Sequence, residues 1–304
     1  MRGRALLILL LLVLSLAAGT AVAQPAAPPA PPPPAPLPRV EVFGGFTVAV
    51  PRLETTLTTS YSPALRFFQT KASTAGQTLQ MAGENGAGVE FGAAFFFTEA
   101  VGIQVLYGAD SFDVGGSNEP YTAHLEYDSR QPPNYTPIPV VIDHEQPWPD
   151  TFGELRQRHF SVNLAGRGRL GPRVTAQLSG GLSYFRMEGL VAPVAFSVYH
   201  LGGHSVLFPE HYELEVALEP GTAFGLNVGG TLDVELARGV ALTADFRYFK
   251  GGTITAPVAV EQILNRDEIG LLDEIETIQE ELHPPAVELK PTRVRLFGGL
   301  KVRF

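Results

Sequence analysis

The stretch RVRLFGGLKVRF, residues 293–304, alternates between two kinds of side chain. Its odd-numbered positions are mostly basic: Arg293, Arg295, Lys301 and Arg303. Its even-numbered positions are mostly apolar: Val294, Leu296, Leu300, Val302 and Phe304. Successive side chains of a β-strand point to opposite faces. The stretch therefore predicts a strand with one charged face and one apolar face.

Seven other segments show the same period of two. With the first stretch they make eight candidate strands, at residues 40–50, 89–97, 101–107, 160–164, 174–184, 224–234, 240–248 and 294–304. Each has about the length that a tilted strand needs to cross a bilayer. No sustained helical period interrupts them until residue 258.

The connections between these segments alternate in length. The short ones lie at residues 98–100, 171–172 and 237–239, and the long ones at about 51–85, 113–156, 188–218 and 251–291. Short turns on one side and long loops on the other are typical of membrane barrels, whose long loops face the cell exterior. The sequence thus predicts an all-β fold, an eight-stranded antiparallel up-and-down transmembrane β-barrel.

A soluble barrel would place its apolar face inside, so the opposite face decides between the two possibilities. That face carries the acids Glu41, Glu90, Asp110, Asp233, Glu235 and Asp245. It also carries the bases Arg167, Arg169, Arg247, Arg293, Arg295, Lys301 and Arg303. An eight-stranded barrel is only wide enough for side chains to fill. Because charges removed from water must be paired, we expect an ion-pair network in a plugged lumen.

The chain resembles the small eight-stranded outer-membrane barrels of the OmpA-transmembrane-domain, OmpW and OmpX types. The resemblance covers residues 39–304 and rests on strand number, loop alternation, VEFGAAFFF at 89–97 and the alternating residues 293–304. It implies a place in the bacterial outer membrane, among its lipids. It also implies that the barrel-assembly machinery reads Phe304 as an assembly signal.

The N-terminal residues predict export. Residues 1–23 have a basic start, an apolar run and an A-x-A site, as in a signal peptide. Residues 24–38 form a Pro/Ala-rich periplasmic linker. Removing Arg2 and Arg4 takes the net charge from −9 to about −11, which argues against nucleic acid as a partner. The chain has no Cys and hence no disulfide framework.

Two groups of residues could carry chemistry. His159 and Ser161 share one face of a strand, as in some lipid A deacylases, but Arg173 stands where an acidic partner would be needed. We expect them to hydrogen-bond in the lumen, with no catalytic residue. His200, His204 and His211 match no close metal-ligand spacing. We therefore expect no enzyme, metal or cofactor.

The last long connection contains apolar residues at spacings of three and four between residues 258 and 282. This predicts an amphipathic helix with an acidic polar face. It could cap the barrel mouth, dock an extracellular partner or gather divalent cations. The second long connection contains Trp148, whose role as a recognition residue or an interfacial anchor stays open.

These observations predict a non-enzymatic barrel with an ion-paired lumen, which serves envelope integrity or surface interaction through large loops. The alternative is an OmpW-like narrow channel for small or hydrophobic solutes.

Overall fold

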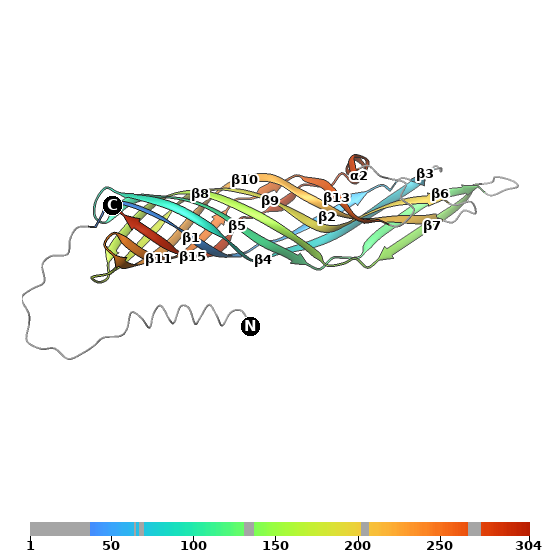
Figure 1. The fold of residues 1–304 in the computed structure, drawn as a ribbon. Coiled ribbons are helices and arrows are strands. Elements are labelled where there is room, and N and C mark those ends of the chain that lie inside the picture. Colours follow the sequence, from blue (N-terminus) through green and yellow to red (C-terminus); the bar gives the residue numbers. More distant parts are fainter. Residues whose placement is uncertain (1–36, 64, 67–69, 131–136, 202–206, 267–274) are drawn as a thin grey trace, which may run out of the picture. The chain divides into compact units, whose positions relative to one another are not determined.

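The computed structural model describes residues 37–63, 65–66, 70–130, 137–201, 207–266 and 275–304. The expected signal peptide and residues 24–36 of the linker lie outside this part. None of the helices in the described part is long and apolar enough to span a bilayer. Almost all of the remaining chain is β-strand (Figure 1).

Eight antiparallel strands form a closed ring. In ring order they are β1 (Val40–Pro51), β4 (Thr70–Phe96), β5 (Val101–Gly116), β8 (Thr151–Arg169), β9 (Val174–Leu201), β10 (Leu207–Ala237), β11 (Val240–Gly251) and β15 (Arg293–Arg303). Strand β1 pairs with β4 on one side and with β15 on the other, which closes the barrel. The predicted eight-stranded barrel is confirmed, and the eight predicted segments coincide with these strands except for Phe97 and Phe304, which lie one residue beyond β4 and β15.

The three short turns are also confirmed. In the first, Thr98 Oγ1 accepts hydrogen bonds from the backbone N–H groups of Ala100 and Val101. In the third, Gly239 has φ = 79°, a left-handed conformation that glycine adopts without steric cost.

The long connections are not ordinary loops. Strands β4, β9 and β10 have 27, 28 and 31 residues, whereas a membrane strand needs only about 9–11. Shorter strands pair with them: β2 (Glu54–Tyr61), β3 (Leu65–Arg66), β6 (Tyr121–Arg130), β7 (Pro137–Gln146) and β13 (Val258–Arg266). Strands β12 (Ile254–Ala256) and β14 (Val287–Leu289) pair with each other. The barrel wall therefore continues beyond the membrane, and we call this part the extracellular extension.

The helix predicted over residues 258–282 is confirmed at its C-terminal end and wrong at its N-terminal end. Residues 258–266 form strand β13, which pairs with β10, and residues 267–274 lie outside the described part. Only α2 (Ile275–Leu282) is helical. Its apolar side chains Ile278 and Leu282 are fully buried in the core of the extension. Val260, Ile263 and Leu264 follow a helical spacing of three and four, whereas Val258 and Val260 follow the strand period of two, and pairing with β10 decides in favour of the strand.

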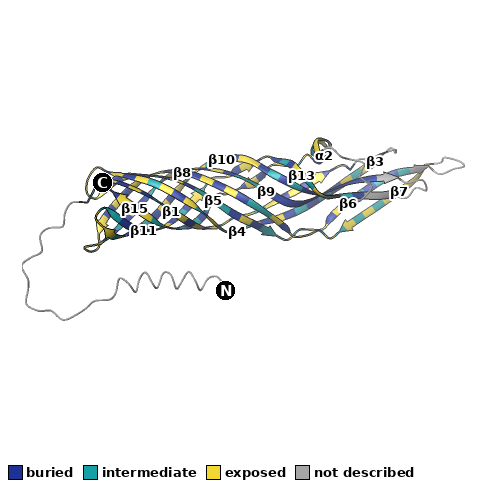
Figure 2. Ribbon diagram, in the orientation of Figure 1, coloured by how far each residue is buried: buried dark blue, intermediate teal, exposed yellow. Residues whose placement is uncertain are grey.

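Burial alternates along the membrane-spanning part of every barrel strand (Figure 2), whereas residues 191–199 of β9, in the extension, are all buried. In the part of the barrel that contains β1, β11, β15 and the short turns, the outward side chains are apolar and exposed. They include Phe46, Phe91, Phe95, Ile103, Phe160, Val162, Leu182, Leu226, Phe246 and Leu300. This apolar belt lies opposite the charged interior. Lipid cannot satisfy polar groups, so an apolar exterior on a closed ring is the arrangement that spans a membrane.

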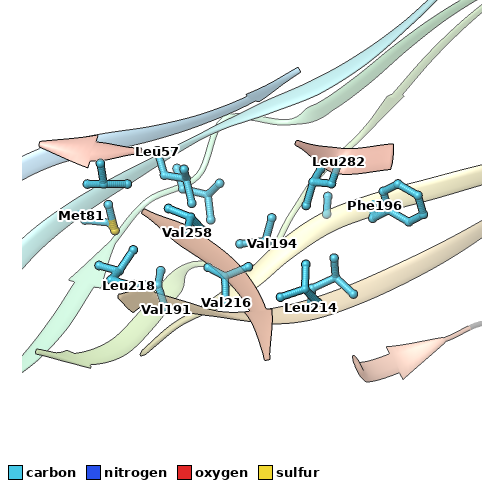
Figure 3. Close-up of a cluster of buried hydrophobic side chains, with 14 of the residues drawn as sticks. Leu57, Met81, Val191, Val194, Phe196, Leu214, Val216, Leu218, Val258 and Leu282 are labelled. Atoms are coloured by element: carbon cyan, nitrogen blue, oxygen red, sulfur yellow. The ribbon is translucent and has the colours of Figure 1, made fainter. Parts of the chain in front are cut away.

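The extracellular extension reverses this arrangement. Its interior is a hydrophobic core that includes Leu57, Met81, Val191, Val194, Phe196, Leu214, Val216, Leu218, Val258 and Leu282 (Figure 3). These side chains come from β2, β4, β9, β10, β13 and α2. The extension is therefore built like a water-soluble β-barrel, with its apolar side chains inside.

Candidate functional site: the charged lumen

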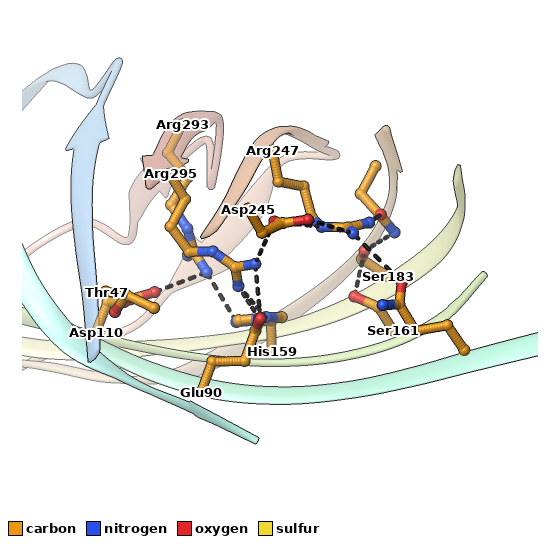
Figure 4. Close-up of polar contacts among 12 residues, drawn as sticks. Thr47, Glu90, Asp110, His159, Ser161, Ser183, Asp245, Arg247, Arg293 and Arg295 are labelled. Atoms are coloured by element: carbon orange, nitrogen blue, oxygen red, sulfur yellow. Dashed lines mark hydrogen bonds and ion pairs between the residues drawn. The ribbon is translucent and has the colours of Figure 1, made fainter. Parts of the chain in front are cut away.

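The lumen of the membrane-spanning part holds two groups of charged side chains. The central cluster comprises Glu90, Asp110, Asp245, Arg247, Arg293 and Arg295, all buried, from β4, β5, β11 and β15 (Figure 4). The periplasmic cluster comprises Glu41, Arg167, Asp233, Lys301 and Arg303. The period of two aims these side chains inward, because each lies on the face opposite the apolar belt.

Arg295 binds two carboxylates of the central cluster. Its Nη1 and Nη2 atoms contact the two carboxylate oxygens of Glu90, the second pair at 2.8 Å. Its Nη2 also lies 3.3 Å from Asp245 Oδ1. A bidentate contact, in which two guanidinium nitrogens bind one carboxylate, is among the strongest arginine–carboxylate ion pairs.

Arg247 joins the carboxylates to uncharged polar groups. It contacts Asp245 Oδ2 at 3.1 Å and donates to Asn227 Oδ1 at 2.6 Å. It also donates to Ser179 Oγ at 2.7 Å. Further hydrogen bonds extend this network around the lumen through Gln104, Asn163 and Ser183.

Arg293 and His159 form the upper edge of the central cluster. Arg293 Nη2 lies 2.8 Å from Asp110 Oδ2 and 2.8 Å from His159 Nδ1. His159 Nε2 lies 3.2 Å from Glu90 Oε2. A neutral ring with its proton on Nε2 can donate to Glu90 while it accepts from Arg293. His159 thus links two acid–base pairs of the lumen.

The periplasmic cluster connects both ends of the strand order. Glu41 of β1 accepts from Arg167 at 2.5 Å and lies 3.2 Å from both Lys301 and Arg303. Asp233 of β10 accepts from Lys301 at 2.8 Å and from Arg303 at 2.6 Å. Two carboxylates are therefore shared among three bases.

Apolar layers separate and cover the two clusters. Phe43, Leu106 and Phe297 pack together, with Lys301 Nζ 5.4 Å from the ring of Phe43. The cavity beside them, lined by residues of both clusters, has a volume of only about 10 Å³, which is room for about one water molecule. Above the central cluster lies an aromatic layer of Phe112, Phe185 and Phe249. The guanidinium carbon of Arg293 lies 4.8 Å from the ring centroid of Phe249.

Two expected members of the lumen network lie apart from it. Glu235 is only half-buried, and no ion pair joins it to another residue of the described part. Arg169 is exposed near the turn between β8 and β9. Both lie close to the periplasmic end of their strands, where the side chains reach solvent.

His159 and Ser161 both point into the lumen. Ser161 Oγ lies 2.7 Å from Ser183 Oγ, and His159 is engaged by Glu90 and Arg293. Both side chains are buried and lie on the face opposite the lipid-facing Phe160. Their surroundings are those of hydrogen-bonding lumen residues.

The other residues singled out in the sequence lie elsewhere. His211 hydrogen-bonds Ser197 in the extension, while the side chains of His200 and His204 lie outside the described part. Among the described residues no group of three or more His, Asp and Glu could hold a metal ion. Trp148 donates to the Pro193 carbonyl at 3.2 Å and packs on the extension core. Phe304 is exposed, and its N–H donates to the Val40 carbonyl.

The sequence placed Gln104, Asn163 and Asn227 on the inward face, but sequence reasoning missed Ser179, Ser183 and the aromatic layer. Gln104, Asn163, Ser179, Ser183 and Asn227 bind one another or Arg247. Their inward positions follow from the same alternation. The aromatic layer continues that alternation past the belt, at residues that lie just beyond the predicted strand segments.

Comparison with known proteins finds similarity in solved structures alone. No family model and no curated protein matches the sequence. OprG from Pseudomonas aeruginosa, an outer membrane protein, has 10% identity and a TM-score of 0.42, over 89% of this chain and 98% of that one. Ail of Yersinia pestis, the attachment invasion locus protein, has 7% identity and a TM-score of 0.31, over 88% and 99%.

The outer membrane protease OmpT from Escherichia coli is also similar, with 6% identity and a TM-score of 0.37 over 87% of this chain and 97% of that one. Similarity at this level does not tell which role, if any, the chain shares with these proteins. The closed ring, the apolar belt and the charged interior carry the conclusion about class. The chain is a small eight-stranded β-barrel of the bacterial outer membrane.

Proposed function

We propose that the chain is a non-conducting, non-enzymatic barrel that holds a rigid β-structure on the cell surface, for envelope integrity or surface interaction. The observation that carries this proposal is the continuous filling of the barrel interior. From the periplasmic end upward it consists of ion pairs, an apolar layer, more ion pairs, an aromatic layer and the extension core.

The filling of the lumen also weighs against the alternative of a narrow channel. A permeating ion or solute would have to displace Arg295 from both Glu90 and Asp245. It would also have to pass the buried rings of Phe185 and Phe249. Breaking a buried ion pair costs about 3–5 kcal/mol, and the aromatic layer offers a passing ion no polar partner.

The proposal that the barrel is not an enzyme rests on the surroundings of His159 and Ser161. Ser161 bonds to another serine, and His159 bonds to charged lumen residues. A nucleophile needs a base within hydrogen-bonding reach and access to substrate. Neither side chain has access to lipid.

The surface of the extension supports the interaction role. An open groove of about 790 Å³ is lined by hydroxyl and carboxylate groups of β2, β4, β6 and β7, among them Thr58, Thr74, Thr78, His124 and Asp143. The apolar stripe of α2 packs inward, so a partner at this helix would meet its acidic side chains Glu276 and Glu280. We propose that extracellular partners use these polar surfaces.

We further propose that Phe304 serves the barrel-assembly machinery. Its ring is exposed at the outer face of the closing strand. If Phe304→Ala slows insertion in cells while refolding in detergent is unchanged, the ring acts in assembly. Equal slowing in both settings would contradict that role.

The test of the plugged lumen is conductance in planar bilayers. We expect the folded wild-type protein to give no steady channel. The double variant Arg247→Ala/Arg295→Ala removes both guanidinium groups of the central cluster but leaves the aromatic layer and the extension core in place, so it should also give no steady channel. Large, steady conductance of the wild-type protein would overturn the proposal. Heat-modifiable migration on gels verifies that each sample is folded.

A further inference from the structure

We infer that the barrel carries a binding site for phosphate groups of outer-leaflet lipid headgroups, formed by Arg158 and Arg186 on the outer wall. The site lies where the apolar belt ends and the extracellular extension begins. It is distinct from the lumen clusters, which face the other side of the same strands.

The first line of evidence is the order of outward side chains along the strands. On β8 the outward position after Phe160 is Arg158, and on β9 the position after Tyr184 is Arg186. Lys250 follows Tyr248 on β11 in the same way. On these three strands the first outward side chain beyond the aromatic residue at the edge of the apolar belt is therefore a cation; exposed apolar side chains recur only further along, at Phe152 and Leu190. Such a position lies at the level of the lipid headgroups.

The second line of evidence is the register of β8 and β9. Arg158 and Arg186 are direct cross-strand partners, and the neighbouring pair is Arg156 with Glu188. Like charges directly opposite each other are destabilising in a sheet. An anion between the two guanidinium groups would turn this repulsion into attraction.

The carboxylates nearby neutralise the arginines only in part. Glu188 lies 3.6 Å from Arg158 Nη2 and 3.4 Å from Arg186 Nη2, and Glu154 lies 3.0 Å from Arg156 Nε. The two Glu188 contacts are long for charge-assisted hydrogen bonds, which are typically about 2.7–2.9 Å. Each guanidinium has five N–H donors. The side chains of Arg158 and Arg186 are 52% and 46% exposed, so a ligand can reach both guanidinium groups.

The third line of evidence is the charge of the extension. The described side chains of β2, β6, β7, β13 and α2 include carboxylates but no lysine or arginine; the carboxylates are Glu54, Glu126, Asp128, Asp143, Glu145, Glu261, Glu276, Glu280 and Glu281. Arg158 and Arg186 therefore stand beside a wall whose described side chains on these five elements are acidic. This contrast favours an anion held at the edge of the membrane.

Phosphate is the anion that suits this pair. Its oxygens accept bidentate hydrogen bonds from guanidinium groups, and a second arginine adds further donors. Long connections mark the outer side of the membrane, so the phosphate belongs to a lipid of the outer leaflet. Exposed arginines that are merely hydrated would show no preference between phosphorylated and dephosphorylated lipid.

The test uses the full folded barrel in detergent with equal amounts of diphosphoryl lipid A and the same lipid A after dephosphorylation. Lipid that stays with the protein through purification is quantified by mass spectrometry. We expect the wild-type protein to retain the phosphorylated form preferentially. Arg158→Gln/Arg186→Gln should lower that preference about 30-fold, since each cation near a membrane surface contributes about one kcal/mol. The matched control Arg173→Gln/Arg238→Gln removes two exposed cations at the opposite rim and should leave it unchanged.

Three results would overturn the inference. The wild-type protein could show no preference for phosphorylated lipid A, or the Arg158→Gln/Arg186→Gln variant could retain it as the wild type does. Excess inorganic phosphate could also displace the lipid completely, which would identify a free-phosphate site instead. If the double variant does not fold, the preference for phosphorylated lipid A is measured on the single variants Arg158→Gln and Arg186→Gln instead, and an unchanged preference in both would overturn the inference. Conductance does not enter this test, so its outcome is independent of the proposed function.

Discussion

The membrane-spanning part and the extracellular extension share strands but have opposite polarity. On β9, Ser183 and Phe185 both point inward, whereas Tyr184 and Arg186 both point outward. Within two residues the inward side changes from polar to apolar, and the outward side changes from apolar to charged. The backbone alternation is continuous through this point. The change therefore follows from the surroundings, because lipid surrounds the membrane-spanning part and water surrounds the extension.

The two parts also differ in what holds them together. The membrane part depends on ion pairs and hydrogen bonds across the lumen, with lipid on its apolar side. The extension depends on hydrophobic burial, as a soluble domain does. The comparison teaches that one β-barrel can be stabilised by two different interactions stacked along its axis. Each prediction below perturbs one of the two parts, in order of decreasing effect.

The largest effect is expected from Arg295→Ala. The variant leaves Glu90 and Asp245 buried without their shared base. We expect a loss of about 5 kcal/mol in the free energy of unfolding, at the upper end for a broken buried pair. Urea unfolding in lipid vesicles measures it. Arg238→Ala, an exposed arginine of the same barrel, should change stability by less than about 0.5 kcal/mol. Equal effects of the two variants would show that the lumen pairs do not stabilise the barrel.

A somewhat smaller effect is expected from Phe249→Ala, at the boundary between the two parts. Its buried ring contacts Arg293, His159 and Phe185. Removing it leaves a cavity, and we expect a loss of about 3–4 kcal/mol. The control is Phe246→Ala, whose ring faces lipid on the same strand. A loss no larger than that of the control would mean that the aromatic layer is not closely packed.

Leu214→Ala should affect the extension alone. Leu214 is fully buried in the extension core, far along β10 from the lumen residues. We expect a loss of about 2–3 kcal/mol, measured by hydrogen exchange as faster exchange of amides in the extension. The amides of the belt should keep their protection. Uniform acceleration along β10 would show that the two parts unfold as one unit.

The smallest effect is expected from the titration of His124 in the extension. Hydrogen bonds to Asp143 and then to Glu126 raise the pKa of His124 above its ordinary value. The protonated ring is the stabilised form, so its contribution is complete below the unfolded pKa of about 6.5. It is lost as the pH rises through the higher folded pKa.

An NMR titration of the His124 ring measures this shift. Asp143→Asn should return the pKa toward its ordinary value, and Glu126→Gln should do so to a smaller extent. A ring that titrates at or below its ordinary pKa in the wild-type protein would contradict the assignment.

Much of the membrane part could be predicted from the sequence, because lipid requires apolar side chains at the outward positions of every strand. The inward position of Arg247 follows from the outward positions of Phe246 and Tyr248. Its partners do not follow, because they depend on how the strands are staggered. Arg293 and Asp110, for example, meet across the lumen from β15 and β5, which are not neighbours in the ring.

The extension could not be predicted in the same way. Strand β2, ETTLTTSY, buries Leu57, Thr59 and Tyr61 and exposes polar side chains between them. A mixture of this kind lacks the uniform apolar face by which the membrane strands were recognised. For residues 258–266, strand and helix spacings both fit, and only pairing with β10 distinguishes them.

The strand that closes the ring also sets the charge of the lumen. Without β15, the five carboxylates Glu41, Glu90, Asp110, Asp233 and Asp245 face two arginines, Arg167 and Arg247. Strand β15 supplies the four remaining bases of the two clusters: Arg293, Arg295, Lys301 and Arg303. A barrel that lacks this strand is therefore open on one side and has mutually repelling carboxylates in its interior. Closure of the ring and neutralisation of its interior are one event, so an incomplete barrel has little tendency to persist as a stable product.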